Sequence, residues 1–353
     1  MGPQGAAGLL PVCDHYCGVD ARMRKSLRLQ SEMMQEYGAC VFDVTLDCED
    51  GAPSGGEADQ ASLVAELAIA SWQSGGHGDL RRLKQRVGVR VHPVGHEAFV
   101  SDIDIIVGSA HDALSYVMVP KVETIEEVQR AVDWIDAVAG GRAAGHGDVA
   151  VRSPLPLHVL IESPAAVSHV FEIARHPRVE SISFGLMDFV SAHGGAIGAG
   201  AMRVRPVSDH ASLDQFHHPL VVRAKLEISS ACHAAGKVPS HCVVTEIRDT
   251  MLVQRAAKLA SQAFGFSRMW SVHPDQIRPI IEALAPAPDE IDAAGRIIEA
   301  AALQDWAPIS VNGTLHDRAS YRYFWQVLER AHQTGRDLPD PMKSYFCAPI
   351  LAH

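Results

Sequence analysis

The sequence has few of the features that mark secreted, membrane-spanning or zinc-binding chains. Its seven cysteines are scattered and odd in number, and the closest pair, Cys13 and Cys17, has no second pair to complete a zinc site. No apolar run approaches the roughly 20 residues of a membrane helix. Residues 1–20 lack the basic start and sustained apolar block of a secretory signal. No H-E-x-x-H pattern ties any of the 19 histidines to a metal. We therefore expect reduced thiols in a cytoplasmic protein without a membrane partner.

Positive charge is also in short supply. The chain has 31 Lys and Arg against 42 Asp and Glu, a net charge of −11 with His neutral. Nucleic acids and anionic membranes bind to basic patches, so we expect neither as a partner. Hydrophobic residues at 47% and charged residues at 21% are typical of a globular protein with a core. The 353 residues suffice for one large α/β barrel or two ordinary domains.

Short apolar segments alternate with amphipathic ones along most of the chain. This alternation predicts a parallel sheet that is covered on both faces, because buried parallel strands read as continuous apolar runs. Eight strand candidates within about 270 residues match a closed (β/α)8 TIM barrel. An open doubly wound sheet is the alternative. The expected strands are 10–17, 40–47, 87–92, 116–120, 157–161, 180–185, 237–242 and 266–272, and the clearest helices are 60–72, 123–138 and 219–235.

The chain continues beyond what a barrel requires. After "APAPDE" at 285–290, further helices are expected at 291–303 and 317–332, followed by a proline-containing tail. We therefore predict a (β/α)8 catalytic barrel over residues 1–288 and a C-terminal helical extension, or lid, over residues 289–353.

Polar side chains recur at the ends of the expected strands, where barrel enzymes place their active sites. They are Asp47, Glu49 and Asp50 in "LDCEDGAP", Arg90 in "VRVHP", Lys121 in "PKVET", Glu162 in "LIESP" and Asp188 in "FGLMD". Arg90 can hold a carboxylate or stabilise an enolate oxygen. The alternative for Arg90 is a salt bridge to Glu49 or Asp50. Lys121 can close the bottom of a pocket or pair with Glu49.

Glu162 ends an unbroken apolar run, and a buried carboxylate must be solvated, paired or bound to a cation. Glu162 and Asp188 follow consecutive strands, which lie ~4.8 Å apart in a sheet. They can therefore grip one hard cation, and Mg²⁺ suits two carboxylates with positions left open for a 2-oxo acid. The alternative is that Glu162 pairs with Arg90 or Lys121. We assign the residues that lead to Asp188 (Gly185, Leu186 and Met187) to substrate binding.

Taken in order, these motifs resemble those of the citrate lyase beta-subunit-like family, which includes the malyl-CoA and citramalyl-CoA lyases of the HpcH/HpaI aldolase superfamily. "LDCEDGAP" is similar to its D-L-E-D-A-V segment, and "VRVHP" to its R-x-N-P segment, with His92 in place of asparagine. "VPKVET", "IESPAAV", "FGLMDF" and "GFSRMWSVHPDQI" also match in order and spacing, over about residues 40–330.

The resemblance implies a (β/α)8 barrel with a helical extension, assembled as a trimer or hexamer. It implies that Glu162 and Asp188 ligate Mg²⁺, and that Arg90 binds the 2-oxo acid and its developing charge. Glu49 and Asp50 would support the arginine and the metal-bound waters. "VNGTLHDRASYRYFWQVLERA" resembles the family's tail, which makes Asp317 the candidate acid/base at a neighbouring subunit's site. The alternative role for Asp317 is a helix N-cap.

The implied reaction is reversible carbon–carbon cleavage of a 3-hydroxyacyl-CoA, or a related hydroxy acid, to a 2-oxo acid and an acyl product. Two segments depart from the family pattern, and the second of them concerns CoA binding. "DHYCGVD" replaces the family's Pro-Gly pair after the first strand, and "SGGEADQASLVAEL" lacks the lysine and arginine usual on the next helix. A malyl-type thioesterase and a non-catalytic 2-oxo-acid-binding paralogue are therefore the alternatives.

Overall fold

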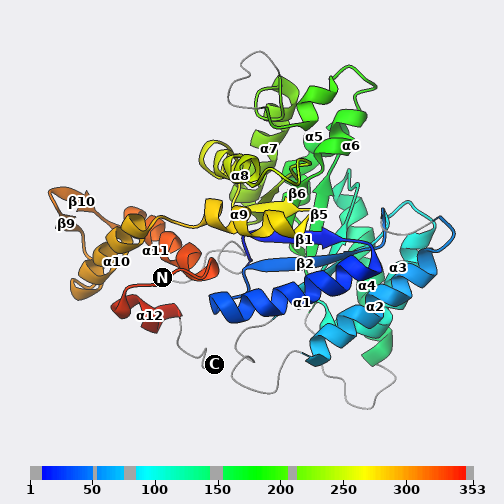
Figure 1. The fold of residues 1–353 in the computed structure, drawn as a ribbon, viewed down its shortest axis with the longest axis horizontal. Helices are drawn as coiled ribbons and strands as arrows, with labels where there is room; N and C mark the ends of the chain where they lie inside the picture. Colours follow the sequence, from blue (N-terminus) through cyan, green and yellow to red (C-terminus); the bar gives the residue numbers. More distant parts are fainter. Residues whose placement is uncertain (1–9, 51–53, 75–84, 144–153, 206–212, 347–353) are drawn as a thin grey trace.

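Eight parallel strands close into a barrel at the centre of the fold (Figure 1). The computed structural model describes residues 10–50, 54–74, 85–143, 154–205 and 213–346. Each strand pairs with the next in chain order, and β1 also pairs with β8, where Cys13 lies opposite Met269. This closure confirms the predicted barrel and excludes the open sheet. The strands are β1 (Cys13–Cys17), β2 (Phe42–Asp47), β3 (Val87–Arg90), β4 (Tyr116–Val119), β5 (Leu157–Ile161), β6 (Val179–Phe184), β7 (Val238–His241) and β8 (Arg268–Ser271).

Helices follow the strands and pack around the barrel, with a large apolar core between the two layers. Their ends carry the expected local signals. Ser163 caps α5 by accepting a hydrogen bond from the amide of Ala166, and Pro164 opens that helix. Gly265 ends α8 in the left-handed conformation, at φ 73°. The helices are α1 (Asp20–Tyr37), α2 (Glu57–Ser74), α3 (Ala98–Ala110), α4 (Ile125–Ala143), α5 (Pro164–Arg175), α6 (Leu186–Ser191), α7 (Pro219–Ala235), α8 (Thr250–Phe264) and α9 (Pro274–Leu284).

The barrel interior is polar near the amino ends of its strands, although branched apolar residues usually fill this space. Arg268 is 1% exposed, and its Nη2 lies 2.6 Å from Asp43 Oδ2 and 3.2 Å from Asp14 Oδ2. Thr45 Oγ1 donates to Asp14 at 2.7 Å and lies 2.7 Å from the Tyr116 hydroxyl. Buried charges are tolerated when they compensate one another in this way. An apolar cluster also fills the interior and consists of Tyr116, Met118, Leu160 and Trp270.

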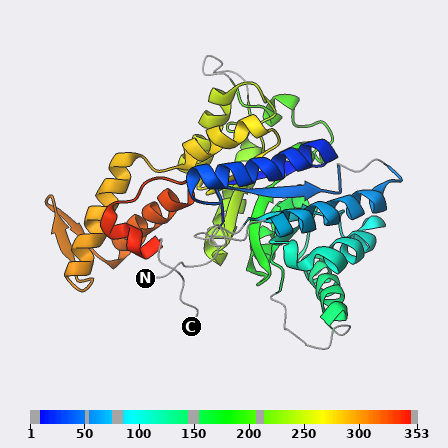
Figure 2. The ribbon, with the colours of Figure 1, turned by 60° about the horizontal axis from the view of Figure 1, so that its bottom comes forward.

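The C-terminal extension lies to one side of the barrel and has an apolar core of its own (Figure 2). It contains α10 (Pro288–Leu303), β9 (Ile309–Val311), β10 (Thr314–His316), α11 (Arg318–Gln333) and α12 (Asp340–Phe346). The hairpin and α12 add to the two predicted helices. The hairpin turns at Asn312 and Gly313, both at positive φ, which is the Asn-Gly signature of a tight turn. The predicted domain boundary at 288/289 falls at the first turn of α10. Across the described ranges, no helix is both long and apolar enough to cross a membrane.

Candidate active site

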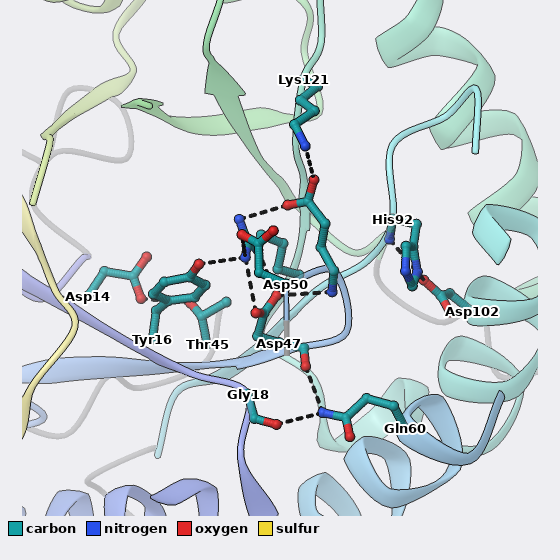
Figure 3. A network of polar contacts seen from close by, with 12 residues as sticks. Asp14, Tyr16, Gly18, Thr45, Asp47, Asp50, Gln60, His92, Asp102 and Lys121 are labelled. Atoms are coloured by element: carbon teal, nitrogen blue, oxygen red, sulfur yellow. Dashed lines mark hydrogen bonds and ion pairs between the residues drawn. The ribbon is translucent and has the colours of Figure 1, made fainter. Parts of the chain in front are cut away.

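The carboxyl ends of β2 and β3 bring Arg90 against three carboxylates, of which Figure 3 labels Asp47 and Asp50. Asp47 lies opposite Arg90 in the strand register and accepts from Nε at 2.7 Å and from Nη2 at 3.0 Å. Such a bidentate pair fixes the guanidinium plane. In the connection between β2 and α2, Glu49 lies 2.7 Å from Nη1 and Asp50 lies 2.7 Å from Nη2. The salt bridges that were the alternative role of Arg90 are therefore present, and Asp47 adds a third.

These contacts keep Arg90 charged although it is buried. Burial by itself lowers the pKa of the guanidinium, but Asp47, Tyr16 and Glu49 outweigh it and hold that pKa well above its ordinary value. Arg90 is therefore a permanent, oriented cation at the rim of the barrel.

Lys121 connects Arg90 and its three carboxylates to Glu162. It follows β4 at φ 53°, a left-handed conformation that non-glycine residues rarely adopt. Its main-chain N–H donates to Glu162 Oε2 at 2.9 Å, and its Nζ donates to Glu49 Oε1 at 2.6 Å. The alternative pairing of Lys121 with Glu49 is therefore observed. Lys121 meets Glu162 through its backbone.

Glu162 lies just past the end of β5 and is 5% exposed. Within the described ranges it forms no ion pair with a basic side chain, so the alternative pairing with Arg90 or Lys121 is not found there. Burial, together with the nearby charges of Asp188 and Glu49, raises the pKa of Glu162 to about 8. The ionised carboxylate of Glu162 therefore has too little positive charge around it to balance its own charge.

Asp188 stands in the first turn of α6, near enough for its charge to act on Glu162. Gly185, which lies between these two residues in the sequence, passes directly against the carboxylate of Glu162. A Cβ at that position would lie 2.3 Å from Oε1. In the part of the chain that the structure describes, no three His, Cys, Asp or Glu side chains form a metal cage. Two carboxylates with the remaining positions left to water and substrate fit Mg²⁺, which binds in that way.

The other two residues assigned to substrate binding pack inward. Leu186 is buried in the hydrophobic core, and Met187 packs against the same core. Gly185, the third assigned residue, lies so close to Glu162 that a Cβ there would meet its carboxylate. Leu186 and Met187 therefore help to anchor α6, which carries Asp188, and their assignment to substrate binding stays a prediction.

Asp317 is the N-cap of α11 in the extension. Its Oδ1 accepts from the amides of Ala319 at 2.9 Å and Ser320 at 3.4 Å. The expected capping role is therefore present. Asp317 is exposed and has no hydrogen bond or ion pair with the rim residues described above. An acid/base role would place it at the rim of another subunit.

Tyr16 was not predicted from the sequence, yet it touches the site. Arg90 Nη2 donates to its hydroxyl at 2.5 Å, and the guanidinium carbon lies 4.5 Å from the centre of its ring. An aromatic residue within a strand reads as core, so no sequence signal distinguished Tyr16 from the core residues.

His92 is a second residue that the sequence analysis did not assign to the site. Its Nδ1 lies 2.7 Å from Asp102 Oδ2, and its ring stacks on that of His96 with the ring centres 4.5 Å apart. The H-x3-H spacing of these two histidines was an available signal for that pair.

Curated relatives match most of the chain at low identity. The L-malyl-CoA/beta-methylmalyl-CoA lyase of Cereibacter sphaeroides is 25% identical over 306 residues, which cover 85% of this chain and 90% of that enzyme. The malyl-CoA/beta-methylmalyl-CoA/citramalyl-CoA lyase of Chloroflexus aurantiacus is 23% identical over 73% of this chain and 74% of its own. The citrate lyase beta subunit of Escherichia coli is 25% identical over 70% and 74%.

Solved structures match the whole architecture. A crystal structure described as a citrate lyase from Burkholderia xenovorans LB400 is 46% identical, covers 94% of both chains and has a TM-score of 0.75. The CitE protein of Mycobacterium tuberculosis, solved with magnesium, acetoacetate and coenzyme A, is 18% identical and has a TM-score of 0.62. It covers 92% of this chain and 99% of its own, and it supports the fold.

Residues 29–274 match the family described as HpcH/HpaI aldolase/citrate lyase. This span is more than half of the chain and contains every strand of the barrel except β1. The predicted family and the predicted lyase class are confirmed by these matches. The protein belongs to the HpcH/HpaI aldolase/citrate lyase family.

Proposed function

We propose that the protein is a Mg²⁺-dependent carbon–carbon lyase. Its substrate would be a 3-hydroxyacyl-CoA of the malyl-CoA or citramalyl-CoA type, or a related hydroxy acid, which yields a 2-oxo acid and an acyl product. The observation that carries the proposal is that Arg90 and the pair Glu162 and Asp188 lie at the carboxyl ends of β3, β5 and β6. The relatives support it, since they are named as malyl-CoA lyases and a citrate lyase beta subunit.

Glu162 and Asp188 would hold the ion. The rim has an excess of negative charge, with five carboxylates (Asp47, Glu49, Asp50, Glu162 and Asp188) against the side chains of Arg90 and Lys121. A divalent cation favours the ionised form of Glu162 and offsets this excess. When bound, Mg²⁺ supplies Lewis-acid stabilisation of the oxygens of a 2-oxo acid. Magnesium in the M. tuberculosis structure supports this assignment.

Arg90 would bind the 2-oxo acid fragment and stabilise negative charge as the carbon–carbon bond breaks. Asp47 and Glu49 hold its guanidinium in place, and Asp50 completes the acidic support. Lys121 would orient two of the acids, Glu49 through its ammonium and Glu162 through its amide. Such preorganised contacts need no rearrangement at the moment of reaction.

Asp317 would provide or remove a proton on the acyl fragment, acting at the rim of a neighbouring subunit in a trimer or hexamer. Its fixed position at the start of α11 supports this, because a helix cap holds the carboxylate in one orientation.

The CoA group of the substrate has evidence on both sides. Helix α2 contains no lysine or arginine that could bind its phosphates. The complex of the M. tuberculosis protein with coenzyme A favours it.

A panel of hydroxyacyl-CoA esters and free hydroxy acids, each with Mg²⁺, tests the proposal through release of 2-oxo acids. We expect glyoxylate or pyruvate from at least one substrate, and a loss of about 100-fold or more in turnover for Glu162→Gln and Asp188→Asn. Glu172→Gln on the exposed face of α5 is the matched control and should keep full activity.

Other results would select the alternatives. Release of free thiol without free acyl-CoA and without a 2-oxo acid would identify a malyl-type thioesterase. Mg²⁺-dependent binding of a 2-oxo acid without turnover of any substrate would identify a non-catalytic paralogue. Turnover that survives removal of divalent cations and the Glu162→Gln change would overturn the metal assignment.

A further inference from the structure

The guanidinium of Arg90 has a closed side and an open side. On the closed side, the side chains of Asp47 and Glu49 are only 4% and 7% exposed. On the open side, Nη2, which also donates to Asp47, meets Asp50, whose side chain is 69% exposed, and the partly exposed Tyr16 (Figure 3). An incoming ligand therefore reaches Arg90 at Nη2.

Asp50 is the contact that is easiest to displace. An ion pair that involves an exposed carboxylate contributes little stability, because water solvates the carboxylate almost equally well. Removing Asp47 or Glu49 from Arg90 would instead leave a buried charge without its partner, which is costly. A negatively charged oxygen of a substrate would therefore take the place of Asp50.

The hydroxyl of Tyr16 stays in place at this open corner. Its ring lies beneath the guanidinium carbon at 4.5 Å and packs against Trp270 at 5.4 Å. Trp270 is itself held by a 2.7 Å hydrogen bond from its indole N–H to Ser183 Oγ. Two contacts on the ring thus fix the position of the hydroxyl.

The hydroxyl is also ready to donate a hydrogen bond. Its oxygen accepts from Arg90 Nη2, so the O–H proton points away from that nitrogen. Burial raises the pKa of Tyr16 well above its ordinary value; Arg90 opposes this shift, and the carboxylates near the hydroxyl add to it. The group is therefore a neutral donor at every pH at which the enzyme would work.

We propose that Tyr16 is a substrate-contacting residue that donates a hydrogen bond to the 2-oxo oxygen, beside Arg90 Nη2, after Asp50 has moved aside. Tyr16 and Arg90 would then form a two-donor clamp on the oxygen that gains charge in the reaction. This inference rests on the proposed function, because it takes a 2-oxo acid as the ligand. It adds a specificity determinant, since the clamp requires an oxygen at carbon 2.

Calorimetric titration with pyruvate in the presence of Mg²⁺ tests the clamp, with propionate as the probe that lacks the 2-oxo oxygen. Tyr16→Phe keeps the ring and removes the hydroxyl. We expect it to weaken pyruvate binding by about 10-fold to 100-fold, the range for a hydrogen bond to a charged group, and to leave propionate binding unchanged. Asp50→Asn should strengthen pyruvate binding, because the ligand no longer competes with a carboxylate. Tyr323→Phe, an exposed tyrosine on α11, is the matched control and should match the wild type.

Each contrary result has a distinct meaning. Equal binding of pyruvate by the wild type and Tyr16→Phe would overturn the contact. Equal weakening of pyruvate and propionate would show that Tyr16 only positions Arg90, and would also overturn it. Weaker pyruvate binding by Asp50→Asn would overturn the displacement of Asp50. A wild type that binds neither pyruvate nor glyoxylate and releases no 2-oxo acid in the substrate panel would refute the proposed function and this inference together. Retained wild-type binding of pyruvate with an unaffected Tyr16→Phe would refute the inference alone.

Discussion

Adding one methyl group at Gly185 should disable the proposed metal site while the barrel remains folded. In Gly185→Ala, the new Cβ would lie 2.3 Å from Glu162 Oε1, 2.4 Å from Cγ and 2.8 Å from Cδ. Ordinary van der Waals contact begins at 3.4 Å. The carboxylate must therefore retreat by about 1 Å, whereas metal–ligand distances tolerate shifts of only ~0.2 Å.

The consequence should be larger for activity than for stability. A displacement of ~1 Å at a reacting group can cost about 100-fold in rate, whereas overpacking by one methyl group typically costs about 1–3 kcal/mol. We expect Gly185→Ala to lose about 100-fold in 2-oxo acid release and in affinity for Mg²⁺, measured by steady-state kinetics and metal titration. Its unfolding transition should stay cooperative in urea.

Gly198→Ala is the matched control. Gly198 lies in the same connection between β6 and α7, and a Cβ there meets nothing within 4 Å. It should behave as the wild type in every assay. Wild-type activity and Mg²⁺ affinity in Gly185→Ala would refute the reasoning, because they would mean that the position of Glu162 against Gly185 does not matter for the site.

Further changes probe other parts of the molecule. Arg90→Lys keeps the charge but cannot pair bidentately with Asp47, so turnover should fall by roughly 100-fold to 1,000-fold, and wild-type kinetics would contradict the role of Arg90. Lys225 on α7 is fully buried, and burial lowers its pKa from 10.5 to about 8. Between pH 8 and 10.5 the unfolded chain binds more protons at Lys225 than the folded chain does, so the free energy of unfolding should rise with pH. Urea unfolding at pH 7.5 and 10.5 should show a rise of roughly 3 kcal/mol for the wild type relative to Lys225→Met. A constant difference between the two proteins would contradict this. Asp317→Asn should preserve the helix cap yet lower turnover, and mixing it with inactive Glu162→Gln should restore activity if sites are shared between subunits.

Much of the fold could be predicted because its signals are local. The expected strand at 157–161 is β5 residue for residue, and the expected helix at 219–235 is α7. Both rest on short-range patterns. The strand is an apolar run that ends before Glu162, and the helix is an amphipathic stretch that begins at Pro219 and ends before Gly236. The hairpin of β9 and β10 was not predicted, although the Asn-Gly turn between them was present in the sequence. Its strands have only three residues each, too few for a period-2 pattern to stand out.

The candidate site could be predicted as a set of residues but not as a network. The rule that active sites lie at the carboxyl ends of barrel strands collected Glu49, Arg90, Lys121 and Glu162 on one rim. It could not say which of them would pair. The bond between Lys121 Nζ and Glu49 spans 72 positions, and the one between Arg90 and Tyr16 spans 74. Side-chain partners at such separations depend on strand register and on loop conformation.

Local sequence patterns were enough to predict the alternation of strands and helices, the number of barrel strands and the polar residues that end them. These features can be predicted locally because a parallel sheet is buried on both faces, so each strand is a continuous apolar run in the sequence. Three contacts between distant segments became visible in the folded chain: Tyr16 meets Arg90, Gly185 lies against Glu162, and Asp14 and Asp43 share Arg268 inside the barrel. Closure of β8 onto β1 creates the last of these contacts, because it joins segments that are more than 200 residues apart in the chain.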